Sequence, residues 1–202
     1  SNLSDECNRM LVLASVLGRE FALDALARLA GVCEDELLDT LDEPIADRVV
    51  SDVPAGAGRL RFAHVLIRDT LYDGLTSARR VRLHRLVLDA LEALYGEEPG
   101  PHLAELAHHA VAGRDLDQGV RYARRAGDRA LRLLAYEEAV RLYETALETL
   151  DLSGASDERA RCRLLLSLGE AEARAGDAPA AKGTFIGAAD IARRLGLASE
   201  LA

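Results

Sequence analysis

The sequence of 202 residues has no tryptophan, a single methionine, three phenylalanines and five prolines. Its longest apolar runs, such as residues 11–17, are far shorter than the roughly 20 residues that cross a bilayer. No basic stretch followed by an apolar core marks a signal peptide. With 49% hydrophobic and 29% charged residues, the composition is typical of a mainly helical globular protein rather than a disordered one.

Cysteine is scarce, and Cys7, Cys33 and Cys162 lie far apart in the chain. An odd number of widely separated cysteines predicts neither a disulfide framework nor a CxxC metal site. We therefore expect a protein of the reducing cytoplasm.

The sequence also lacks the motifs of a nucleotide site or a nucleophilic active site. Neither a Walker lysine motif nor a GxGxxG loop occurs, so this chain cannot form a complete nucleotide site by itself. No serine, cysteine or threonine stands beside an evident base. We predict that the chain is not an enzyme and holds no cofactor of its own.

The net charge of −9 is distributed unevenly. Residues 1–58 carry 4 arginines and 12 acidic residues, residues 59–85 carry 7 arginines and 2 acidic residues, and residues 86–202 carry 14 basic and 20 acidic residues. A cationic segment between two acidic ones is suited to contact a phosphate group or the acidic surface of a neighbouring domain.

Residues 1–95 begin with the pattern of three short helices. Ser4 is a good N-cap for the first, Gly31 can end the second, and Pro44 is expected to kink or end the third, which spans residues 34–47. The side chains of this third helix that we expect to face the core are Leu37, Leu38, Leu41 and Ile45.

A β-hairpin and a fourth helix complete this first part. Residues 49–53 and 59–63 are predicted strands joined by a five-residue loop, and residues 78–95 are a predicted helix. Three helices followed by a hairpin is a winged-helix pattern, so we predict a winged-helix-like module with an added helix. The inward face expected for that added helix consists of Leu83, Leu86, Val87, Ala90, Leu91 and Leu94.

Residues 96–101, Gly-Glu-Glu-Pro-Gly-Pro, are the clearest helix breaker, and we place a domain boundary there. Residues 96–202 then read as antiparallel helices in a tetratricopeptide-like repeat array. Gly127 and Gly169 are 42 residues apart, against about 34 for that repeat, so roughly eight extra residues are expected near residues 151–157. The repeated positions, which we interpret as packing residues, are Gly127, Ala139, Tyr143 and Ala146, followed by Gly169, Gly176, Ala181, Phe185 and Ala188.

Glu172 departs from this repeat, because it stands where an aromatic residue is preferred, and it predicts looser packing of the last unit. Another candidate group, His102, Glu105 and His109, is spaced to share one helical face that could bind a metal. No HExxH motif or cysteine accompanies it, so we interpret it as ordinary helix surface and predict no metal site.

The winged-helix pattern invites a DNA-binding interpretation, which the charges of the third helix oppose. This helix would occupy the recognition position, yet it carries seven carboxylates and no basic residue. Nucleic-acid affinity comes largely from lysine and arginine, so direct DNA contact is the less favoured alternative. A basic surface of Arg79, Arg80, Arg82 and Arg85 keeps it open, and the same arginines could instead contact a phosphate, a domain or only solvent.

His64 is the most informative single residue, because it lies where a predicted strand ends and a helix begins. The apolar residues that we expect on the buried face of this helix and just after it are Val65, Leu66, Ile67, Leu71 and Leu75. An imidazole at the entrance of a helix can meet a phosphate group, or it can cap the helix or fill a core position. The sequence leaves these alternatives open.

Several segments of residues 3–150 resemble one family of large bacterial regulators. The segments are residues 11–21, 34–38, 61–64, 66–72 and 78–80, and the family is that of the signal-transducing ATPases with numerous domains. It includes LuxR-type transcriptional regulators with an N-terminal ATPase, and related ATPase modules fused to nucleotide cyclases.

The resemblance implies a cytoplasmic protein in which a P-loop ATPase, a winged helix and a helical repeat sensor follow one another. This chain is similar to the last two. Residues 62–66 also resemble the Met-His-Asp motif of plant resistance ATPases, which implies that His64 senses the ADP phosphate, although Val65 replaces the aspartate. The implied partners are the ATPase domain with its ATP or ADP, and a protein or small-molecule effector bound by the repeats. A scaffold without nucleotide sensing is the alternative.

Overall fold

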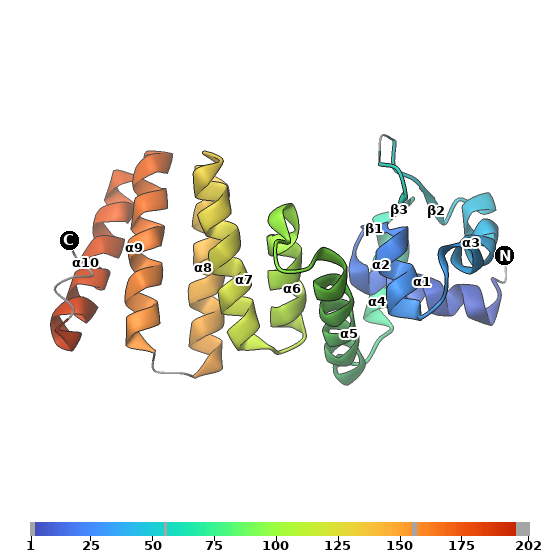
Figure 1. Cartoon of the computed structure of the whole chain (residues 1–202), viewed down its shortest axis with the longest axis horizontal. Coiled ribbons are helices and arrows are strands. Elements are labelled where there is room, and N and C mark those ends of the chain that lie inside the picture. Colours follow the sequence, from blue (N-terminus) through green and yellow to red (C-terminus); the bar gives the residue numbers. More distant parts are fainter. Residues whose placement is uncertain (1–2, 55, 155–156, 197–202) are drawn as a thin grey trace. The chain divides into compact units, whose positions relative to one another are not determined.

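The computed structural model describes residues 3–54, 56–154 and 157–196, and it divides into two compact units, Ser1–Glu97 and Glu98–Ala202. We refer to these as unit 1 and unit 2. The described residues are mainly helical with one small antiparallel sheet, which confirms the predicted mainly-α fold class (Figure 1).

Unit 1 combines helices with a short three-stranded sheet. Its elements are α1 (Asp5–Leu17), β1 (Glu20–Ala22), α2 (Leu23–Ala30), α3 (Glu34–Ala46), β2 (Val50–Asp52), β3 (Arg59–Phe62), α4 (Val65–Asp73) and α5 (Ser77–Tyr95). Helix α1 contacts α2, α3, α4 and α5, so it lies at the centre of the helical part.

The predicted ends of the first helices are confirmed. The Ser4 hydroxyl accepts a hydrogen bond from the backbone N–H of Cys7 and caps α1, while Gly31 ends α2 with a φ of 73°. Helix α3 continues through Pro44 and ends two residues later, at Ala46. The prediction that Leu38 faces the core is wrong, because α3 buries only the narrow stripe of Leu37, Leu41 and Pro44.

The sheet contains the two predicted strands and one that was not expected. Strand β3 lies in the middle, antiparallel to β2 on one side and to β1 on the other. The Phe21 ring of β1 packs against the Phe62 ring of β3, with 5.7 Å between centroids, and both rings are buried. Strand β1 therefore contributes an aromatic residue to the core, although it is only three residues long.

Helix α5 confirms the predicted added helix but presents a different face to the core. Leu86 is exposed, whereas His84 and Leu88 are buried, so the prediction for Leu86 is wrong. The buried stripe runs through Leu83, His84, Val87, Leu88 and Leu91.

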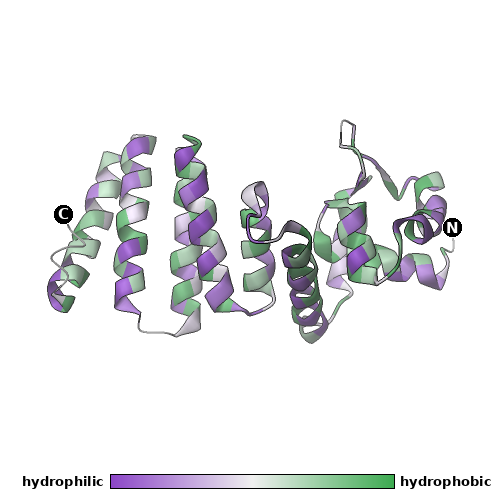
Figure 2. Cartoon of the chain, in the orientation of Figure 1, coloured by the Kyte–Doolittle hydropathy of each residue, from purple (hydrophilic) through white to green (hydrophobic). Residues whose placement is uncertain are grey.

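Unit 2 is a series of antiparallel helices, each packed on the next along the chain. Its elements are η1 (Gly100–His102), α6 (Leu103–Ala112), α7 (Leu116–Arg132), α8 (Tyr136–Ser153), α9 (Glu158–Ala175) and α10 (Ala178–Leu195). Figure 2 shows both hydrophobic and hydrophilic residues along these helices, as expected for helices that bury only part of their surface.

The hairpins α7–α8 and α9–α10 repeat one another with a shift of 42 residues, which was the spacing read from the glycines. Asp115 and Asp157 cap their first helices in the same way, each accepting from the backbone N–H three residues on. The expected extra residues do not all lie in a loop, because Asp151 to Ser153 form the last turn of α8. Residues 155 and 156 lie outside the described part.

The predicted packing role of the repeated small and aromatic residues is confirmed, except at Gly176, which is exposed and ends α9 with a φ of 91°. A Cβ atom added at Gly127 would lie 2.7 Å from the Tyr143 ring, and one added at Gly169 would lie 2.7 Å from the Phe185 ring. Each glycine is therefore required for an aromatic ring to pack across its hairpin. The small residues at equivalent positions, Ala139, Ala146, Ala181 and Ala188, are all buried.

Candidate functional site

His64 stands between β3 and α4, as predicted, at the N-cap position of the helix. Its side chain is exposed and makes no capping hydrogen bond, and the first turn of α4 contains no acidic residue. The alternative of a capping or core histidine is therefore wrong. A free imidazole beside the N-terminus of a helix is an arrangement that favours an anionic group.

The expected buried face of α4 is wrong for its first residues. Val65 is 46% exposed and Leu66 is 74% exposed, and no residue of the helix is fully buried. The orientation of α4 is set by Arg68, whose Nε donates a hydrogen bond of 2.9 Å to the backbone oxygen of Ser15 in α1. Leu66 lies two residues before Arg68, on another side of the helix, and faces away from α1.

Tyr72 joins α4 to α5. The guanidinium groups of Arg68 and Arg80 lie over its ring, with their Cζ atoms 4.5 and 4.6 Å from the centroid. Its hydroxyl is 2.9 Å from Nε2 of the buried His84, a partner that could not be predicted from the sequence. This cluster fixes the helix that His64 precedes.

The four arginines predicted as a phosphate or domain contact are not equivalent. The Arg80 side chain forms hydrogen bonds within unit 1. Its Nε donates to the backbone oxygen of Leu75, and its Nη2 contacts Asp73. Arg79, Arg82 and Arg85 are exposed, and Arg85 makes a further interaction within the chain. The candidate cationic surface is therefore smaller than the sequence indicated.

The acidic character of the third helix is a surface property, as predicted. All seven carboxylates expected there are exposed, and none is placed in the core. The group consists of Glu34, Asp35, Glu36, Asp39, Asp42, Glu43 and Asp47. Negative charge also affects the interior, because burial, followed by the charges of Glu43 and Asp47, raises the pKa of the Cys7 thiol.

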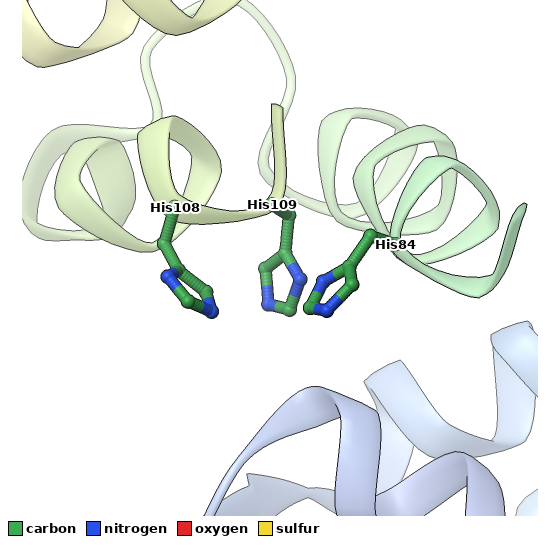
Figure 3. Close-up of side chains that lie close together, drawn as sticks. All are labelled: His84, His108 and His109. Atoms are coloured by element: carbon green, nitrogen blue, oxygen red, sulfur yellow. The ribbon is translucent and has the colours of Figure 1, made fainter. Parts of the chain in front are cut away.

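The interpretation of His102, Glu105 and His109 as ordinary helix surface is wrong for His109, which is buried. His102 Nδ1 lies 3.3 Å from a Glu105 carboxylate oxygen, so these two form a pair on the surface of unit 2. His109 is buried and its ring packs edge-on against that of His108, with 5.1 Å between centroids. Figure 3 shows these adjacent histidines on α6 and labels His84 of α5.

Unit 2 contains a groove that the sequence did not predict. A cavity of about 330 Å³ is lined by Arg125, Asp128, Arg129 and Arg132 of α7, together with Glu98, Gly100 and Leu103. A second, more apolar cavity of about 170 Å³ shares Gly100, Leu103 and Arg129 with it and extends to α8. The spacing of Arg125, Arg129 and Arg132 on one helical face was the signal that could have indicated it.

This groove is connected to the core of unit 2 through Tyr143. The Tyr143 hydroxyl donates a hydrogen bond of 2.8 Å to Asp128 Oδ1, and the tyrosine is only 1% exposed. Burial, followed by this hydrogen bond and the charge of Asp128, raises the pKa of Tyr143 well above its usual range. The carboxylate that lines the groove is thus held in place by a buried residue.

The raised pKa of Tyr143 predicts a loss of stability at alkaline pH. The folded state holds the phenol proton more tightly than the unfolded state, so the contribution is complete below about pH 10 and decreases as pH rises above it. The decrease is at most about 1.4 kcal/mol per pH unit. Urea unfolding at a series of alkaline pH values should show that the stability difference between wild type and Tyr143→Phe shrinks as pH rises. A difference that is independent of pH would contradict this assignment.

Comparison with known protein families, with curated proteins and with solved structures finds no match. The family resemblance is therefore supported only by the sequence segments in which it was found. The helices that the structure describes include no segment with the length and hydrophobicity of a membrane span.

Proposed function

We propose that this chain is the regulatory and interaction part of a bacterial ATP-dependent transcriptional regulator of the LuxR type. In this proposal unit 1 is a winged-helix-like module that relays the nucleotide state of an ATPase domain in the same polypeptide. Unit 2 is a tetratricopeptide-like array that binds a protein or small-molecule effector. The chain itself performs no catalysis, and ATP or ADP is held by the ATPase domain.

The observation that carries the proposal is the unused side chain of His64. It is exposed at the first turn of α4, it caps nothing, and the fold of unit 1 makes no use of it. The helix that follows is held by Arg68 and Tyr72, so the position of His64 is fixed by neighbours. A fixed imidazole beside backbone N–H groups is suited to a phosphate oxygen.

The groove of unit 2 supports the second half of the proposal. It joins a cationic part, lined by Arg125, Arg129 and Arg132, to an apolar part near Leu103 and Leu142. Sites that bind effectors are usually concave, with a few placed polar groups beside apolar surface. The same groove favours the alternative of a repeat scaffold that binds a partner without sensing nucleotide.

DNA binding through the Arg79–Arg85 surface is the less favoured alternative. The Arg80 guanidinium contacts Leu75 and Asp73, so one of the four cations of this surface is not available to DNA. The exposed carboxylates of α3 oppose any approach of phosphates to the recognition position.

His64→Ala tests the proposal in a protein that includes the ATPase domain. We expect the variant to release ADP about tenfold faster or more, because a charge-assisted hydrogen bond to phosphate is lost, and to raise basal transcriptional output. Unit 1 should keep its stability to within about 0.5 kcal/mol, because the exposed side chain supports no other residue. ADP release is measured by stopped-flow with a fluorescent ADP analogue.

His102→Ala is the matched control, since it removes another histidine at a helix entrance in unit 2 and should leave ADP release unchanged. Unchanged ADP release in His64→Ala, with wild-type output, would reject nucleotide sensing and leave the scaffold alternative. Salt-dependent DNA binding that is lost in Arg79→Ala and Arg82→Ala would instead support the DNA alternative.

A further inference from the structure

The two hairpins of unit 2 differ in the residues that one face of their first helix carries. The hairpins repeat with a shift of 42 residues, so each residue of α7 has an equivalent in α9. Arg125 and Arg129 of α7 line the groove of unit 2, whereas their equivalents in α9 are Ser167 and Ala171. The packing of a hairpin therefore does not require arginine at either position.

The acidic residue beside these arginines is held by a tyrosine instead of an ion pair. In α9, Glu170 and Arg174 are four residues apart and form an ion pair of 2.7 Å. The equivalent residues of α7 are Asp128 and Arg132, and within the described part of the chain Asp128 forms no ion pair. Its carboxylate accepts a hydrogen bond of 2.8 Å from the Tyr143 hydroxyl, and the equivalent ring of the next hairpin belongs to a phenylalanine, which has no hydroxyl. Arg132 is thus left without the partner that its equivalent has.

Arg129 is a half-buried cation that lines both cavities of the groove. Its guanidinium makes no hydrogen bond, ion pair or ring contact with the residues that the structure describes. The carboxylates near it do not neutralise it, because Glu138 pairs with Arg141 and Glu98 is exposed. A cation that is partly removed from water without a partner costs free energy, which an anionic ligand would offset.

The apolar cavity that Arg129 also lines is left open by a small residue. Ala130 forms part of its wall, and the equivalent of Ala130 in α9 is Glu172, a larger side chain that is buried. Helix α9 therefore places a side chain where α7 has only a methyl group. Leu133 lines the same cavity and is 60% exposed, so an apolar body that enters here would cover it.

We propose that the groove of unit 2 binds a small amphiphilic anion. A carboxylate or phosphate group meets Arg129 and Arg132, and an apolar body enters the cavity beside Leu103 and Ala130. This inference rests on the proposed function of unit 2 as an effector-binding array, and it names the chemical class of that effector. Guanidinium groups bind carboxylate and phosphate alike, through paired charge-assisted hydrogen bonds.

The charges of the groove favour a ligand with one anionic group over an extended polyanion. Glu98 and Asp128 line the same groove as the three arginines, so a chain of phosphates would meet carboxylates as well as cations. Cavities of about 330 and 170 Å³ suit a small organic ligand.

Four probes of equal chain length test the proposal: hexanoate, hexyl phosphate, hexanol and hexylammonium. Each is titrated into the whole chain, and binding is followed by backbone-amide chemical shifts. We expect the two anions to shift residues 100–104 and 125–133, and the neutral and cationic probes to bind at least about tenfold more weakly. Shortening the anions to butyl chains should weaken binding about fivefold or more, because less apolar surface is buried. The tighter of the two anions identifies the preferred head group.

Arg129→Met should weaken binding of the anions about tenfold or more, because it removes the guanidinium and keeps an apolar side chain. Arg132→Met is a second variant at an exposed position, where folding is not at risk, and should weaken binding about threefold or more. Arg124→Met is the matched control. It makes the same change of charge on the same helix, but Arg124 is exposed and lines neither cavity, so binding should be unchanged.

Two results would overturn this ligand class while leaving the groove as an effector site of other chemistry. They are equal binding of hexanol and hexanoate, and equal losses in Arg124→Met and Arg129→Met. Absence of binding by all four probes would also overturn it. None of these results affects the measurement of ADP release in His64→Ala, which tests nucleotide sensing by unit 1 separately.

Discussion

Replacing Tyr143 with alanine should destabilise unit 2 by about 3–5 kcal/mol, whereas Phe185→Ala should cost only about 1–2 kcal/mol. The two residues occupy equivalent positions in successive hairpins, and each packs on a glycine. Tyr143 is enclosed between α7 and α9, so its removal leaves a cavity that the surrounding helices cannot fill. Phe185 is 39% exposed, so its replacement by alanine removes less buried apolar surface.

The loss at Tyr143 also includes a polar contribution. Its hydroxyl donates to Asp128, and the alanine variant leaves that carboxylate without this partner. Tyr143→Phe separates the two effects, because it keeps the ring and removes only the hydroxyl.

The measurement must resolve unit 2 from unit 1, since two units can unfold separately. Urea unfolding followed by hydrogen exchange on α7 to α10 does so. Leu152→Ala is the control, because this leucine is exposed and its loss should change stability by no more than about 0.5 kcal/mol. Equal losses at positions 143 and 185 would show that α9 does not protect Tyr143.

Features that depend on residues close in the chain were predictable from the sequence. The caps at Ser4 and Gly31 require only a neighbouring turn, and both were identified. The repeat of 42 residues could be predicted from glycines and aromatic residues, because each glycine packs against an aromatic ring of its own hairpin. These features depend on local geometry, which a short stretch of sequence is enough to predict.

Features that depend on distant residues were not predictable. Strand β1 is three residues long and exists because it pairs with β3, some 40 residues later. The direction of α4 depends on a hydrogen bond from Arg68 to Ser15, and its hydrophobic pattern alone placed Val65 and Leu66 inside. Periodicity shows which residues share a helical face, but not which face the rest of the unit covers.

The candidate site shows the same division. The position of His64 at a strand-to-helix junction followed from the local pattern, whereas its lack of any capping bond required the structure. The basic residues of α5 appeared equivalent in the sequence, yet Arg80 is held by Leu75 and Asp73. The groove of unit 2 could not be located from the sequence, because its lining combines arginines of α7 with Glu98 and Gly100, which precede α6.

Four glycine-to-alanine substitutions should give effects of opposite sign in unit 2. Alanine favours a helix over glycine by about 1 kcal/mol, so each change begins with this gain. At Gly127 the new methyl group would lie 2.7 Å from a Tyr143 ring that is buried and has no room to move. We expect Gly127→Ala to be net destabilising by about 1–3 kcal/mol.

Gly169→Ala should cost less, because the methyl group meets the half-exposed Phe185 ring, which can swing toward solvent. Gly183→Ala and Gly187→Ala should each stabilise the chain by about 1 kcal/mol, since the added carbon makes at most an ordinary contact. Thermal unfolding of the four variants measures the order of stability. Destabilisation by Gly183→Ala in the chain as it stands would contradict the open space at this position.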